Sequence, residues 1–155
     1  MAIRREDYIL ELIEELQAFV AQALNLADSG RLGEALMAMV RAQEKLFARP
    51  MAEFVSLGID EQLRLLQLDE APDRARAKVL AYAALLTESG KIYGGRGRRD
   101  LAASAFQLAL YATLTVAVGD PGRAAELRPA IAELRDRLPD STLNPLVREL
   151  LDRLG

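Results

Sequence analysis

The sequence predicts an all-α fold for this chain of 155 residues. Apolar residues recur at steps of three and four in almost every segment, which is the periodicity of one face of an α-helix. Valine, isoleucine and threonine are scattered, and no alternating apolar–polar run bounded by turns indicates a β-strand. Glycines and prolines punctuate the chain where such helices would end or begin.

The first half of the chain divides into four expected helices. The first runs from about residue 8 to residue 27 and ends at Ser29 and Gly30, because glycine adopts the left-handed cap conformation without strain. The second runs from about residue 32 to residue 47, and Pro50 prevents simple continuation. Residues 51–57 can form a short helix closed by Gly58, and Asp60 is the expected N-cap of the fourth.

The second half is expected to contain longer helices. An acidic start at residues 69–73, with Pro72 in the first turn, opens a helix that reaches about residue 93. A glycine-rich turn at 94–97 separates it from a helix over about 99–118. Pro121 begins the next helix, which Pro129 either kinks or divides. Residues 139–141 precede a last amphipathic helix that ends near Leu154.

Two segments carry the same pattern of small and aromatic residues. One comprises Leu86, Gly90, Tyr93, Gly97, Ala102, Phe106 and Ala109. Positions 67 residues earlier hold Phe19, Ala23, Leu26, Gly30, Ala35, Met39 and Ala42. The pattern resembles the tetratricopeptide repeat (TPR), a hairpin of two antiparallel helices with a small residue at their contact. Phe106 is then expected to be a buried anchor of the second hairpin.

This resemblance implies one domain, a right-handed TPR-like array of about six to eight helices. Hairpins are expected over about 16–49 and 83–116, a helical insertion over about 50–82, and C-terminal capping helices over about 120–154. A plain helical bundle is the alternative, since small residues occur at helix contacts there too. The opening Asp7, Tyr8 and Ile9 also resemble the start of a small bacterial all-helical family of unknown function.

Composition argues against several kinds of chemistry. The chain has no cysteine and no histidine, which removes thiolate zinc sites, cysteine nucleophiles and the commonest general base. Glu11, Glu14 and Glu15 share one helix, where a solvated outer face is favoured over a carboxylate or metal site. Ser104 and Thr87 have no histidine to activate them. We therefore expect a non-catalytic protein without metal or cofactor.

Charge and hydropathy limit the partners. The net charge is −3, so a general attraction to nucleic acid is not expected. No stretch approaches the roughly 20 uninterrupted apolar residues of a membrane-spanning helix, and acidic residues interrupt any N-terminal signal core. We expect no membrane partner and a cytoplasmic location.

The TPR resemblance implies a binding site for a protein or peptide. TPR hairpins bind peptides on the exposed face of their first helices, and the matching positions here are Ala84, Thr87, Glu88 and Lys91. The basic clamp by which some of these proteins hold peptide carboxylates is not reproduced. The expected function is a protein-interaction module, an adaptor or scaffold.

Two further surfaces are candidates. Arg96, Arg98 and Arg99 follow a glycine-rich turn and offer an alternative function, binding of a phosphate ligand or RNA. A flexible turn with solvated arginines is the interpretation we favour. The apolar stripe of the first helix is wide enough to suggest a homodimer with contacts at Tyr8, Leu12 and Phe19, although burial in the core explains them equally well.

Overall fold

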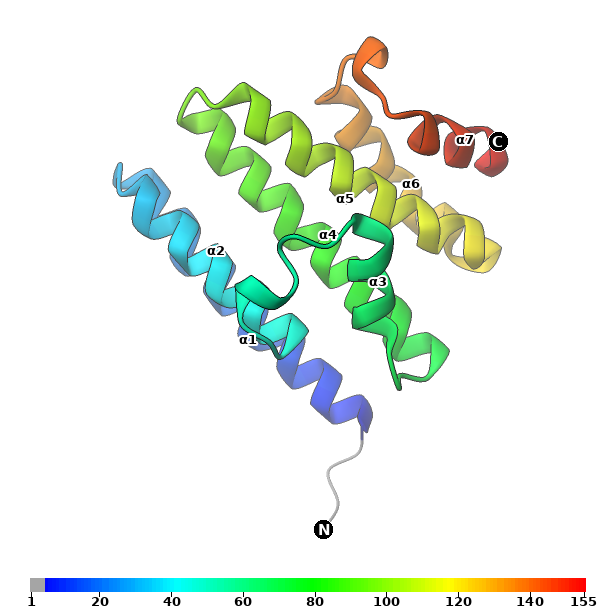
Figure 1. Ribbon diagram of the computed structural model, residues 1–155, viewed down its shortest axis with the longest axis horizontal. Helices are drawn as coiled ribbons and strands as arrows, with labels where there is room; N and C mark the ends of the chain where they lie inside the picture. Colours follow the sequence, from blue (N-terminus) through cyan, green and yellow to red (C-terminus); the bar gives the residue numbers. More distant parts are fainter. Residues whose placement is uncertain (1–4) are drawn as a thin grey trace. The chain divides into compact units, whose positions relative to one another are not determined.

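The computed structural model describes residues 5–155, apart from the side chains of residues 5–9 and of Ser141. This part of the chain forms seven α-helices and two short 3-10 helices and contains no β-strand (Figure 1). The predicted all-α class is confirmed. Contacts divide the chain into two compact units, Met1–Ala81 and Tyr82–Gly155, and α4 passes from the first into the second.

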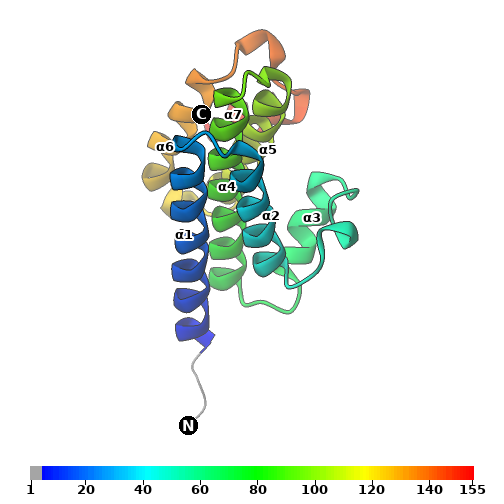
Figure 2. The same cartoon turned by 90° about the vertical axis from the view of Figure 1, so that its left-hand side faces the viewer.

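The first unit is built on the hairpin of α1 (Arg5–Asp28) and α2 (Leu32–Phe47). The two helices run antiparallel and lie side by side (Figure 2). One face of α2 is buried, and small side chains on it allow a close approach. The buried residues are Ala35, Ala38, Met39, Ala42, Leu46 and Phe47. Leu12, Leu16 and Ala23 are the buried residues of α1 within its described part.

The segment after α2 is held by specific contacts. The rings of Phe47 and Phe54 stack with centroids 4.0 Å apart and planes inclined by 7°. The buried amide of Gln62 donates a 2.9 Å hydrogen bond to the carbonyl oxygen of Phe54. The carboxylate of Glu44 accepts a 2.8 Å hydrogen bond from the backbone N–H of Met51. These bonds satisfy polar groups that a loop would otherwise leave without partners.

Two sequence expectations fail in this segment. The expected helix over 51–57 is only one 3-10 turn, η1 (Met51–Glu53). The next helix, α3 (Ile59–Gln67), has Gly58 as its N-cap, and no side chain caps it. Because α3 begins before Asp60, that carboxylate lies in the first helical turn, where it still suits the helix dipole.

The second unit surrounds α5 (Arg99–Gly119). α6 (Pro121–Asp136) and α7 (Pro145–Leu154) both pack against α5, and α4 (Pro72–Gly95) enters the unit as the partner of α5 in the second hairpin (Figure 1). The short helix η2 (Asp140–Thr142) connects α6 to α7. Pro129 neither ends nor divides α6, which continues through it.

The hydropathy of α5 reflects its position in the core. Residues 101–119 carry no charge, and α5 is long and apolar enough to cross a membrane by length and composition alone. The sequence analysis did not single this helix out, because Ser104, Gln107 and Thr113 interrupt its apolar run. In the most apolar window 56% of the residues are buried within the chain. The buried residues are Ala102, Ala105, Phe106, Ala109, Leu110, Ala112, Thr113, Leu114, Val116 and Ala117. This burial is the pattern of a core helix.

The two hairpins have the same turn, 67 residues apart. Gly30 has φ of 78° and Gly97 has φ of 76°, a region that residues with a side chain rarely adopt. The following N–H groups of Arg31 and Arg98 each donate to a carbonyl five residues earlier, at 2.8 and 2.9 Å. This is the Schellman pattern, which satisfies a terminal helix carbonyl and reverses the chain.

Four of the seven matched pairs of the two hairpins are buried at both positions. These pairs are Ala23 with Gly90, Ala35 with Ala102, Met39 with Phe106, and Ala42 with Ala109. Phe106 is only 6% exposed, which confirms its predicted burial. Turn geometry and burial thus agree with the sequence register.

Candidate functional site

The predicted partner-binding residues share one face of α4. Ala84 is exposed, whereas Thr87, Glu88 and Lys91 are half-buried. The hydroxyl of Thr87 donates a 2.8 Å hydrogen bond to the carbonyl oxygen of Ala83, so its methyl group is left for contact. The face therefore combines small apolar groups with charged groups at spacings of three and four residues.

Lys91 connects this face to α6. Its ammonium group lies 3.3 Å from a carboxylate oxygen of Glu88 and 3.3 Å from one of Glu133. Glu133 is also 3.5 Å from the guanidinium of Arg137, which lies 5.4 Å from the ring centroid of Phe106. We name Ala84, Thr87, Glu88, Lys91, Glu133 and Arg137 the α4–α6 surface.

Glu133 and Arg137 are members of this surface that the sequence analysis missed. Their spacing of four residues on one helix predicts an ion pair, but it does not reveal which other helix lies beside them. All four charged side chains remain partly exposed, between 23% and 50%. Exposed ion pairs contribute little to stability, so these groups can exchange partners at small cost.

The backbone N–H groups of the basic turn at 96–98 are all hydrogen-bonded within the chain. The N–H groups of Arg96, Gly97 and Arg98 all donate to carbonyls at the end of α4, at distances between 2.9 and 3.2 Å. They are therefore not directed outward to cradle a phosphate. The three arginines at this turn are exposed: Arg96, Arg98 and Arg99.

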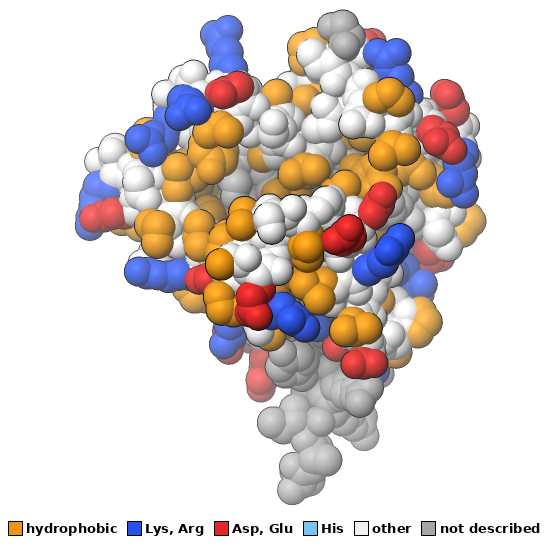
Figure 3. Space-filling model, viewed as in Figure 1, with side chains coloured by type: hydrophobic (Ala, Val, Ile, Leu, Met, Phe, Trp, Pro, Cys, Tyr) orange, Lys and Arg blue, Asp and Glu red, His pale blue; other side chains and the backbone are white. Residues whose placement is uncertain are grey.

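Asp100 supplies an anion of its own at the start of α5. A hydrogen bond from the backbone of Leu101 and one from the side chain of Arg98 lower the pKa of Asp100. Arg98 Nε lies 3.5 Å from its carboxylate oxygen. A phosphate would have to compete with this carboxylate for the helix N-terminus. On the face drawn in Figure 3, acidic and basic side chains are mixed over the lower and right-hand parts, and basic ones predominate at the upper left. These observations do not favour the phosphate or RNA alternative.

The proposed dimer contacts differ in exposure. Leu12 is only 4% exposed and offers no surface, whereas Phe19 is half-buried. The side chain of Tyr8 lies outside the described residues. Phe19 lines a shallow, mainly apolar hollow of about 310 Å³ with Glu15, Ala18, Gln22 and Lys45. An ion pair of 2.9 Å between Lys45 and Glu15 crosses from α2 to α1 at this hollow.

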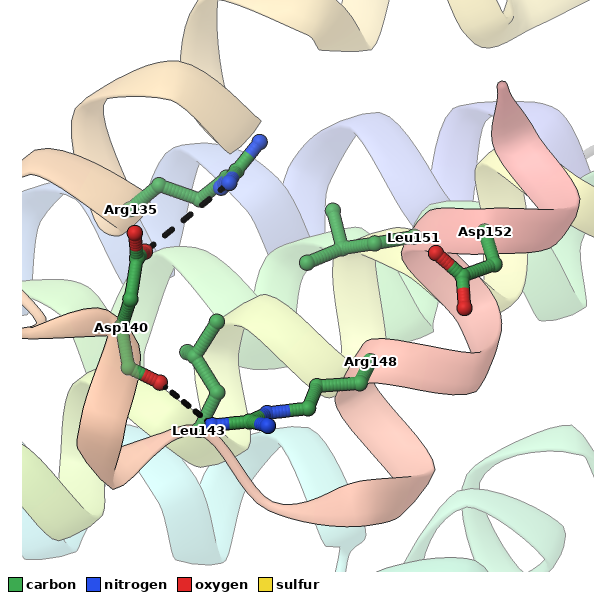
Figure 4. A pocket seen from close by; sticks show the side chains of 6 residues that line it. All are labelled: Arg135, Asp140, Leu143, Arg148, Leu151 and Asp152. Atoms are coloured by element: carbon green, nitrogen blue, oxygen red, sulfur yellow. Dashed lines mark hydrogen bonds and ion pairs between the residues drawn. The ribbon is translucent and has the colours of Figure 1, made fainter.

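A larger hollow lies at the C-terminal end of the chain, where the sequence analysis predicted no site. The C-terminal pocket has a volume of about 470 Å³ (Figure 4). Its lining comes from α6, η2, α7 and the residues between them, and comprises Arg135, Asp140, Leu143, Arg148, Leu151 and Asp152. No local motif marks it, because the arginines and leucines are brought together by the packing of separate elements.

The acidic and hydroxyl side chains singled out in the sequence are placed separately by the structure. In the described part of the chain, no group of three or more acidic, histidine or cysteine side chains is placed to hold a metal ion. Glu11, Glu14 and Glu15 are exposed on α1, and Ser104 is exposed on α5. No family model, curated protein or solved structure matches this chain.

Proposed function

We propose that this chain is a non-catalytic protein-interaction module, an adaptor or scaffold with a TPR-like fold. The observation that carries the proposal is the pair of hairpins with the same Schellman turn and the same buried ladder 67 residues apart. Repeated helical hairpins commonly present surfaces for other proteins rather than catalytic groups. Because a fold alone does not determine a function, the surface chemistry of α4 and α6 is the separate support for a binding role.

The α4–α6 surface is the proposed binding site for a protein or peptide. Exposed Ala84 leaves room for a backbone or a bulky side chain to approach α4. Lys91 and Glu133, already paired with each other, can form new ion pairs with a partner of either sign. Such a surface suits a polar peptide segment. A cytoplasmic location is part of the proposal, and the absence of cysteine agrees with it.

Site-specific photo-crosslinking tests this site. A photoreactive p-benzoylphenylalanine at position 84 should capture a partner in source cells, and the same group at Ala125 is the control. Ala125 is also an exposed alanine but lies on α6 and outside the α4–α6 surface. The captured protein should then bind the purified chain and lose at least about tenfold in affinity with Lys91→Glu. Equal adducts at both positions, or unchanged affinity, would refute the proposed site.

We also propose homodimerisation through the hollow around Phe19. The hollow carries one acidic and one basic residue, Glu15 and Lys45, a composition that can pair with itself across a twofold axis. Sedimentation at micromolar concentration should show a dimer that Phe19→Asp dissociates. Val55→Asp, at a residue that is 59% exposed, is the matched control. A monomeric wild-type chain would overturn this proposal.

A further inference from the structure

The C-terminal pocket has an excess of positive charge at one end. Arg148 Nη2 donates a 2.7 Å hydrogen bond to the backbone carbonyl oxygen of Asp140, which anchors the guanidinium. A carbonyl does not neutralise that charge and occupies only one of the five N–H donors of arginine. Arg135 Nη2 lies 3.9 Å from the carboxylate of Asp140, a long ion pair. The carboxylate of Asp140 thus pairs with Arg135, whereas Arg148 binds the backbone carbonyl of the same residue.

The middle of the pocket is apolar, and its opposite side is acidic. In Figure 4 the side chains of Leu143 and Leu151 lie between the Arg135–Asp140 side and Asp152. A ligand with one carboxylate would balance the charge at the arginine end, while an aliphatic body would contact the leucines. Asp152 would repel a second negative charge at the far end of such a ligand.

We propose that the C-terminal pocket binds a short aliphatic monocarboxylate. The carboxylate lies between Arg135 and Arg148, and the alkyl chain covers Leu143 and Leu151. The C-terminal pocket, of about 470 Å³, is a hollow about as open to solvent as the one beside Phe19, so the proposed ligand is short and stays partly exposed. The anchoring of Arg148 before binding limits the ordering cost, because its guanidinium is already directed by Asp140.

Three small probes of similar length separate the parts of this proposal. 4-Methylpentanoate carries the carboxylate and the branched chain, isopentylamine replaces the carboxylate with an ammonium group, and adipate adds a second carboxylate. Titration followed by NMR should show saturable binding of 4-methylpentanoate, with resonances of Leu143 and Leu151 shifting. The other two probes should bind at least about tenfold more weakly. Absence of saturation in the millimolar range, or equal binding of all three, would overturn the proposal.

Variants of the lining connect the binding to the pocket. Arg135→Gln should weaken 4-methylpentanoate binding about tenfold or more, since it removes a charged hydrogen-bond donor. Arg153→Gln is the matched control, an exposed arginine of α7 that does not line the pocket. Asp152→Asn should strengthen adipate binding without strengthening that of 4-methylpentanoate. A misfolded variant could not bind adipate more tightly. If Asp152→Asn does not strengthen adipate binding, the role given to Asp152 is contradicted.

Discussion

The ring of Phe106 lies directly against the backbone of Gly90, so that α5 contacts α4 where α4 has no side chain. A Cβ atom added at Gly90 would lie 2.5 Å from Phe106 Cε1 and under 3.0 Å from two further ring atoms. Contacts this short do not occur between real Cβ atoms and their neighbours. The large aromatic residue on one helix and the absent side chain on the other are therefore parts of one contact.

Gly90→Ala should destabilise the protein, although alanine normally favours a helix. The clash should cost about 1–3 kcal/mol, against a helix-propensity gain of about 1 kcal/mol. Denaturant unfolding should show a net loss of stability. Gly95→Ala, in the same helix, is the control, because a Cβ atom added at Gly95 meets nothing within 4 Å. Adding Phe106→Leu should reduce the effect of Gly90→Ala, and equal effects in both backgrounds would rule out this contact.

Phe106→Ala should lower the free energy of unfolding by about 3–5 kcal/mol. The side chain is buried, and its removal leaves a cavity beside Gly90 together with the loss of the contact to Arg137. Chemical denaturation measures the change. A loss below about 1 kcal/mol would show that the helices close around the site or that the ring does not anchor the hairpin.

Gln107 should control the attachment of α7 to α5. Its amide nitrogen donates a 2.9 Å hydrogen bond to the carbonyl of Thr142, and its amide oxygen accepts one of 2.7 Å from the N–H of Asn144. Gln107→Met keeps the length of the side chain and removes both bonds, at a cost of about 1–2 kcal/mol. Amide hydrogen exchange should quicken in residues 143–154. Gln22→Met, at an exposed position of α1, should leave that exchange unchanged.

Tyr82 should make the fold sensitive to alkali. Burial raises the pKa of Tyr82 from its ordinary value of 10.0 to about 12, because the buried site disfavours the charged phenolate. Because the folded-state pKa is the higher of the two, the contribution of Tyr82 to the free energy of unfolding is full below pH 10. It is lost as the pH rises from 10 through about 12. Ultraviolet titration of tyrosinate should show a late step that Tyr82→Phe removes. Persistence of that step in Tyr82→Phe, or its loss in Tyr93→Phe, would contradict the assignment.

The sequence by itself determined most of the local structure. The periodicity of apolar residues located the main helices, since an amphipathic face must be buried whatever it packs against. Gly30 and Gly97 located the two matching turns, because a positive φ favours glycine over residues with a side chain. Near residue 60 the local rules failed, since Gly58 and Asp60 are both acceptable caps and α3 has Gly58 at that position.

Only the tertiary structure decided which helix faces are buried and which residues meet. Leu12 and Phe19 belong to the same apolar stripe, yet one is buried and the other lines a surface hollow. Arg135 and Arg148 lie on different helices, and their separation in the sequence gives no sign that they share a pocket. Helical periodicity is a property of one segment, whereas a site between segments depends on how their side chains pack together.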